Sequence, residues 1–161
     1  TRVEGELGFG DVAYERTSFD GREKGREFVG THSALWGITA AVYLSLMGPR
    51  GMQELGQVIL QRSQYLRKRL SDLPGIRAPR FSSAHFKEWV VDLNGTGKSV
   101  AEINAFLLGR EIFGGRDLSL EFPDLGQSAL YCVTEVHTQE DLDRLVDTLS
   151  EFLDGQGGGR S

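Results

Sequence analysis

The histidines and lysines are the residues best suited to chemistry, and their spacing does not indicate a self-contained active site. His32, His85 and His137 lie far apart, and none belongs to a metal-spaced set such as H-x-x-x-H. Spacing also indicates no Ser-His-Asp or Cys-His arrangement. A Schiff-base lysine needs an apolar setting that desolvates its amine, and no lysine has one. The four lysines are Lys24, Lys68, Lys87 and Lys98. We therefore expect neither a catalytic residue nor a metal site in this chain.

The segment Gly95-Thr96-Gly97-Lys98-Ser99 resembles a phosphate-binding loop at first sight. A P-loop requires G-x-x-x-x-G-K-[ST], so that a long wrap of backbone N–H groups surrounds the phosphates. The first glycine of that pattern would fall at position 92, which is Asp92. The segment therefore predicts a turn between a strand and a helix, with Ser99 as the helix cap.

The only cysteine, Cys132, excludes an internal disulfide framework and a cysteine-rich zinc site. It lies in Ser128-Ala129-Leu130-Tyr131-Cys132-Val133, which is typical of a buried strand. We expect a packed core thiol rather than a reactive one.

The residues Thr31, His32 and Ser33 precede an apolar helical pattern, and we name them as the candidate cofactor-binding residues. A helix N-terminus offers free N–H groups and a partial positive charge, which suit an anion. The simpler interpretation, which we prefer, is that Thr31 or Ser33 only caps the helix.

Composition and charge exclude several classes of protein. The chain has 161 residues, of which 39% are hydrophobic, and it carries a net charge of −5. The length predicts a single domain, and the acidic balance argues against binding nucleic acid or an anionic membrane. The longest mostly apolar stretch, 34–47, is shorter than the roughly 20 residues that span a bilayer. With no apolar leader at its start, we expect a cytoplasmic protein. Because it begins without Met, we expect a piece of something longer.

The first part of the chain, residues 1–31, is rich in glycine and charge and shows no helical period. We expect an extended N-terminal arm, with a short strand at 12–14, that packs on a missing domain or a partner chain. The candidate interface residues carry its charge and are Arg22, Glu23, Lys24 and Arg26.

Two helices are predicted next, over about 33–47 and 49–72, with Gly48-Pro49 as the break between them. The remainder alternates strand and helix. It predicts strands at 86–93, within 112–118 and at 130–135, and helices at 99–108 and 138–153. Ser99 with Glu102 forms a capping box, and Thr138 caps the last helix. This order predicts an α/β (α+β) domain over 32–154, a small and mainly antiparallel sheet with helices on one face, followed by a flexible tail at 155–161.

Several runs resemble the C-terminal end of glycine dehydrogenase (decarboxylating) subunit 1, the P-protein of the glycine cleavage system in its two-subunit form. The longest covers Ile112–Val146 and includes Ile112-Phe113-Gly114-Gly115-Arg116, Leu130-Tyr131-Cys132-Val133 and Thr138–Val146. Phe86-Lys87-Glu88-Trp89 and the stretch 40–49 also resemble the family.

The resemblance implies the small C-terminal domain of a type I pyridoxal-phosphate-dependent fold, in an enzyme that decarboxylates glycine. It implies that the pyridoxal lysine lies on the partner, subunit 2, so that no cofactor is bound covalently here. The aminomethyl group would pass to the lipoyl arm of H-protein. The further partners are the missing N-terminal domain of the same subunit and, in a homo-oligomer, a second copy.

One segment departs from the family pattern. Where the family has small polar residues after Arg22-Glu23-Lys24, this chain has Gly25-Arg26-Glu27-Phe28. The alternative interpretation is therefore a non-catalytic interaction or scaffold domain of a divergent paralogue, with a changed substrate or none.

Overall fold

A computed structural model describes residues 2–3, 6–7 and 31–155, with side chains from 34 onward. The chain divides into two compact units, Thr1–Gly48 and Pro49–Ser161. The predicted boundaries at 31/32 and 154/155 stay predictions. The strand expected at 12–14 and the tail beyond 155 lie outside the described residues.

The described part of the first unit contains a hairpin that the sequence did not lead us to expect. Strands β1 (Arg2–Val3) and β2 (Glu6–Leu7) pair antiparallel, with Arg2 opposite Leu7. Two-residue strands give no detectable alternation, so no hydrophobic period could have predicted them.

Helix α2 (Thr31–Ser71) contains the predicted break at Gly48. The backbone of Gly48 has φ 61° and ψ 179°, a non-helical conformation that glycine adopts without steric cost. Pro49 then begins the second helical segment, where its missing N–H costs nothing. Lys68 and Arg69 lie in the last turn, where the helix dipole favours positive charge.

The sheet of the second unit is three-stranded and wholly antiparallel, in the order β3-β5-β4. Its strands are β3 (Glu88–Asp92), β4 (Arg116–Asp117) and β5 (Ser128–Cys132). Strand β5 begins two residues before the predicted 130 and ends at Cys132 instead of 135. It stops there because residues 134–137 turn toward the next helix, with the Thr134 N–H donating to Nδ1 of His137 at 3.0 Å.

Both remaining helices begin where their caps predict. Helix α3 (Val100–Leu108) is opened by Ser99, which forms the predicted capping box with Glu102. Helix α4 (Gln139–Asp154) is opened by Thr138, which forms a second box with Asp141. Two short 3₁₀ helices, η3 (Asn94–Thr96) and η4 (Pro123–Leu125), complete the loops.

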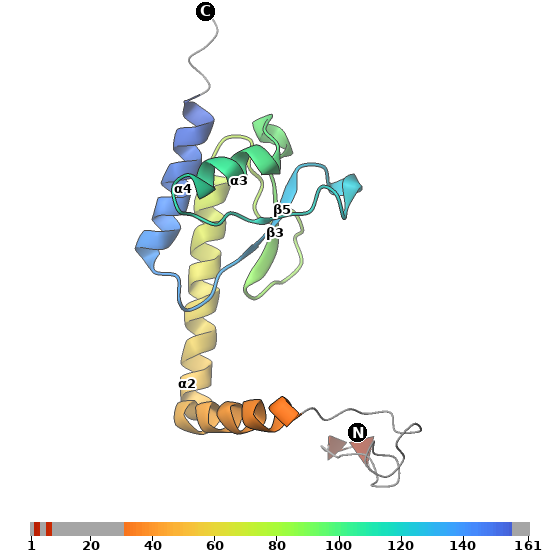
Figure 1. The fold of residues 1–161 in the computed structure, drawn as a ribbon, viewed down its shortest axis with the longest axis vertical. Helices are drawn as coiled ribbons and strands as arrows, with labels where there is room; N and C mark the ends of the chain where they lie inside the picture. The colour runs from red at the N-terminus through yellow and green to blue at the C-terminus, as the bar shows by residue number, and fades with distance from the viewer. Residues whose placement is uncertain (1, 4–5, 8–30, 156–161) are drawn as a thin grey trace, which may run out of the picture. The chain divides into compact units, whose positions relative to one another are not determined.

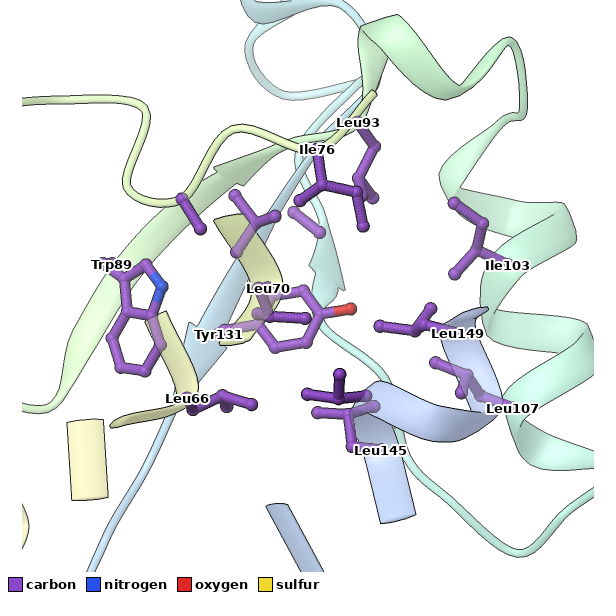
Figure 2. Close-up of a cluster of buried hydrophobic side chains, with 14 of the residues drawn as sticks. Leu66, Leu70, Ile76, Trp89, Leu93, Ile103, Leu107, Tyr131, Leu145 and Leu149 are labelled. Atoms are coloured by element: carbon purple, nitrogen blue, oxygen red, sulfur yellow. The ribbon is translucent and has the colours of Figure 1, made fainter. Parts of the chain in front are cut away.

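The core of the second unit lies between one face of the sheet and the helices. Trp89 and Val91 of β3 alternate toward this face, as do Ala129 and Tyr131 of β5. Figure 1 shows the second helical segment of α2, from Pro49 on, together with α3 and α4 on one side of β3 and β5. The helices contribute buried leucines and isoleucine to the same cluster, shown in Figure 2: Leu66, Leu70, Ile103, Leu107, Leu145 and Leu149. Each buried side chain of this kind contributes about 1.5–3 kcal/mol by leaving water. The predicted fold class is confirmed.

Candidate functional site

The predicted cofactor-binding residues open helix α2, which begins at Thr31, so His32 and Ser33 lie in its first turn. Their side chains are outside the described part of the structure. The predicted interface residues Arg22, Glu23, Lys24 and Arg26 also lie outside the described residues. Both assignments therefore stay predictions.

The segment 95–99 is the turn that its sequence predicts and not a phosphate loop. The backbone N–H groups at the start of α3 already have protein acceptors. Ser99 N–H donates to the Glu102 carboxylate at 2.8 Å, Glu102 N–H donates to the Ser99 hydroxyl at 3.2 Å, and Val100 N–H donates to the Gln127 side chain at 2.8 Å. A phosphate would meet a carboxylate and few available donors, so this turn is structural.

Three lysines fall in the described part of the chain, and none offers an enclosed amine for a Schiff base. Lys68 and Lys87 are exposed. Lys98 is half-buried, and its ammonium lies 5.8 Å from the centre of the Phe152 ring. Because a Schiff-base lysine must be desolvated to lose its proton, we derive no covalent cofactor chemistry from these residues. Within the same residues, no group of three or more potential metal ligands occurs.

A cavity of about 290 Å³ lies beside the carboxyl end of β5, where Cys132, His137, Asp141 and Arg144 meet. Two of its polar side chains already have structural partners. Asp141 accepts from the Thr138 N–H at 2.8 Å, and Arg144 donates to a backbone carbonyl at 2.6 Å. These groups hold the start of α4 in place and leave little free chemistry.

The prediction of a buried core thiol at Cys132 is wrong, because Cys132 is exposed. In β5 the residues that face the core are Ala129 and Tyr131, so Cys132 falls on the opposite face. Partial desolvation raises the pKa of this thiol, and the neighbouring Glu88 carboxylate raises it further. A raised pKa lowers the thiolate fraction, so the exposed thiol is not an activated nucleophile.

An apolar helix surface is the most prominent feature of the first unit. Between 34 and 46 every described side chain of α2 is exposed, and Trp36 and Leu46 are 73% and 82% accessible. The other large apolar side chains there are Leu35, Ile38, Val42, Tyr43 and Leu44. A helix that is apolar on several faces is normally buried in a larger protein.

A second apolar surface covers the outer face of the sheet. Val90 and Leu130 sit opposite each other there, flanked by Phe81 and Phe122, and they line a groove of about 580 Å³. We did not predict this groove, although Trp89-Val90-Val91 carried a signal for it. A continuous apolar run indicates a strand covered on both faces, whereas a half-buried strand alternates.

Among the described residues, no helix is both long enough and apolar enough to cross a membrane.

No protein-family profile matches the chain. Curated relatives match nearly all of it. The chain is 34% identical over 151 residues to a probable glycine dehydrogenase (decarboxylating) subunit 1 of Staphylothermus marinus, covering 94% of this chain and 32% of the relative. It is 41% identical over 130 residues to the protein of the same name from Thermococcus onnurineus, covering 81% of this chain and 28% of the relative.

A solved structure gives the same result. The crystal structure of glycine decarboxylase (P-protein) of the glycine cleavage system, in inhibitor-bound form, superposes with a TM-score of 0.75 at 28% identity. The match covers 93% of this chain and 33% of that one. The resemblance drawn from the sequence is confirmed, and so is the fold. The chain spans about a third of the length of the relatives it matches.

Proposed function

We propose that this chain acts in glycine cleavage as part of a larger enzyme. It is similar to about a third of the length of glycine dehydrogenase (decarboxylating) subunit 1. The observation that carries the proposal is the similarity to curated relatives over 94% of the chain, joined to a TM-score of 0.75 against a glycine decarboxylase. The reaction we propose is decarboxylation of glycine, with transfer of the aminomethyl group to lipoyl H-protein.

The pyridoxal group would supply the electron sink for this decarboxylation when bound to the complete enzyme. We place it on the partner, subunit 2, as the resemblance to the family implies, and the described lysines of this chain, which are exposed or packed on an aromatic ring, are consistent with this. The part left to this chain is structural support: it presents apolar surfaces and the N-terminus of α2 to the rest of the enzyme. Thr31, His32 and Ser33 remain our candidate contacts to the cofactor.

The exposed apolar surface of α2 supports a larger assembly. Seven large apolar side chains between 35 and 46 lie in solvent, which is unfavourable by about 25 cal/mol for each Å² of apolar area. We propose that the part of subunit 1 that this chain does not span covers them. The charged segment around Arg22, Glu23, Lys24 and Arg26 would lie in the same contact or against subunit 2. A cytoplasmic location completes the proposal, since a single unpaired cysteine suits a reducing compartment.

The test is glycine-dependent exchange of labelled bicarbonate. A full-length protein carrying this chain is mixed with its candidate subunit 2 and with H-protein. Exchange above the background of subunit 2 with H-protein supports the proposal. A stable complex without exchange would instead identify the divergent paralogue, whose domain only holds an assembly together.

Two variants distinguish loss of the assembly from a general loss of the folded structure. Ile38→Asp places a charge on the apolar surface of α2 and should weaken the complex at least tenfold. Leu120→Asp is the matched control, because Leu120 is 91% exposed in the second unit and is not part of that surface. Equal behaviour of the two variants in a sedimentation assay would show that the α2 surface is not a contact.

A further inference from the structure

Another cavity of the second unit, of about 230 Å³, has a different character from the apolar surfaces. It lies between the second helical segment of α2 and the loop that leads into β3. Its polar lining is formed by Ser63, Gln64, Arg67, Ser82, Ser83 and His85, and the two other lining residues are Leu60 and Ala84. The lining therefore contains hydroxyl, amide, imidazole and guanidinium groups and no carboxylate.

Ser63 is the unexplained member of this lining. Its side chain is 1% exposed, and its Oγ has no hydrogen-bond partner among the described residues. A buried hydroxyl without a partner costs free energy, so such a group calls for a ligand or a water that satisfies it. Ser63 belongs to neither cap nor turn, because it lies in the middle of a helical segment. It lies at the wall of the polar cavity.

Arg67 supplies the charge. It lies one turn after Ser63 on the same helix and is half-buried, and no ion pair with it occurs in the described structure. Five other arginines, by contrast, are paired with carboxylates: Arg50, Arg69, Arg80, Arg110 and Arg116. A guanidinium without a carboxylate, beside hydroxyl donors, is the arrangement that proteins use for phosphate oxygens.

The far wall of the cavity contacts the sheet through His85. Nδ1 of His85 lies 3.4 Å from the backbone oxygen of Ser83. The His85 ring packs on Trp89, with ring centres 5.7 Å apart, and Trp89 is fixed in the core. The loop that carries the exposed Ser82 and Ser83 thus contacts the sheet through His85, whereas Ser63 and Arg67 belong to the helix.

We propose that this cavity binds a small tetrahedral oxyanion, phosphate or the phosphate group of a monoester, between Arg67 and the hydroxyls of Ser63, Ser82 and Ser83. The cavity could hold one such group, since about 230 Å³ is room for an anion and a few waters. The inference rests on the second unit alone and is independent of the proposed function.

The experiment is a titration of the 161-residue chain with sodium phosphate, followed by backbone amide NMR at constant ionic strength set with sodium chloride. We expect saturable shifts at Ser63, Ser82, Ser83 and His85. A parallel titration with phenyl phosphate separates the sources: tighter binding of the ester indicates a phosphomonoester ligand, and equal binding indicates free phosphate. Acetate binding as tightly as phosphate would overturn the tetrahedral assignment.

Variants of neighbouring residues test the geometry. Arg67→Gln should weaken phosphate binding at least tenfold, and Ser63→Ala should weaken it about threefold without destabilising the empty chain, because its hydroxyl has no partner to lose. Lys68→Gln is the matched control, since Lys68 is the next residue, is exposed and does not line the cavity. The proposal fails if the shifts do not saturate, which would leave a cavity filled by water, or if Arg67→Gln and Lys68→Gln weaken binding equally.

Discussion

Two glycines in adjacent loops touch through their backbones, and this contact gives a quantitative test of the fold. Gly75 follows α2 and Gly95 lies in η3. A Cβ built on Gly75 would stand 2.5 Å from the carbonyl carbon and oxygen of Gly95, and one built on Gly95 would stand 2.8 Å from the Gly75 oxygen. Neither neighbour is a flexible side chain, so the backbone itself would have to move.

Three alanine variants separate the cost of a left-handed backbone conformation from the cost of steric overlap. Gly97 has φ +68° with open space around it, so Gly97→Ala carries only the cost of a left-handed residue, about 1 kcal/mol. Gly95→Ala carries only the steric cost, about 1–3 kcal/mol for forced overpacking. Gly75 has φ +77° as well as the backbone contact, so Gly75→Ala should lose about 2–4 kcal/mol, the sum of the two.

The assay is urea unfolding followed by the fluorescence of Trp89, which is 4% exposed and reports the second unit. All variants carry Trp36→Phe, because Trp36 is exposed and would add a signal from the first unit. The free energy of unfolding follows from the midpoint and slope of the transition.

The order of the losses decides the outcome. We expect Gly75→Ala to be the most destabilised and Gly97→Ala the least. If Gly75→Ala lost no more than Gly97→Ala, the conformation of Gly75 alone would account for its cost and the backbone contact would be refuted. If Gly95→Ala were neutral, the loops would be free to separate.

Three further predictions concern the core and a cap. Burial raises the pKa of Tyr131 to about 12 from an ordinary 10, so the folded state keeps a proton that the unfolded state loses. The free energy of unfolding should therefore fall by up to about 1.4 kcal/mol per pH unit between pH 10 and 12. Urea unfolding measured across this pH range tests the prediction, because Tyr131→Phe should remove this part of the pH dependence. An unchanged pH dependence in Tyr131→Phe would contradict it. Ser99→Ala should cost about 1 kcal/mol in the same assay, because it removes the cap of α3, and no loss would mean that Glu102 alone suffices. Leu107→Ala should lower the free energy of unfolding by about 2–5 kcal/mol, because it leaves a cavity in the core, whereas Leu120→Ala should change it by less than about 0.5 kcal/mol. Similar shifts of the melting temperature for the two variants would show that the core is wrongly placed.

Features set by neighbouring residues were predictable from the sequence. The break at Gly48-Pro49 and the caps Ser99 and Thr138 each depend on a few consecutive residues, and the structure confirms them. The resemblance carried by Ile112–Val146 was predictable for the same reason, since a long run of residues is specific.

Features that depend on how distant segments of the chain pair were harder to predict from the sequence. The exposure of Cys132 depends on the register that places Tyr131 opposite Trp89 and directs both to the core. A one-residue change in that register reverses every side chain, so an apolar run does not reveal which residue faces out. The cavity around Ser63 and Arg67 joins a helix to a loop some 20 residues later, and its parts have no common spacing. No motif could have drawn attention to it.

The position of Cys132 allows its labelling rate to report what covers the outer face of the sheet. As the sole thiol of the sequence, it gives one attachment point for a maleimide dye without any mutation. Being two residues from Leu130 in β5, it lies on the same outer face of the sheet as that groove residue. Its raised pKa lowers the thiolate fraction and so slows labelling. The labelling rate in the isolated chain, compared with that in a full assembly, thus becomes a footprint of whatever covers that face.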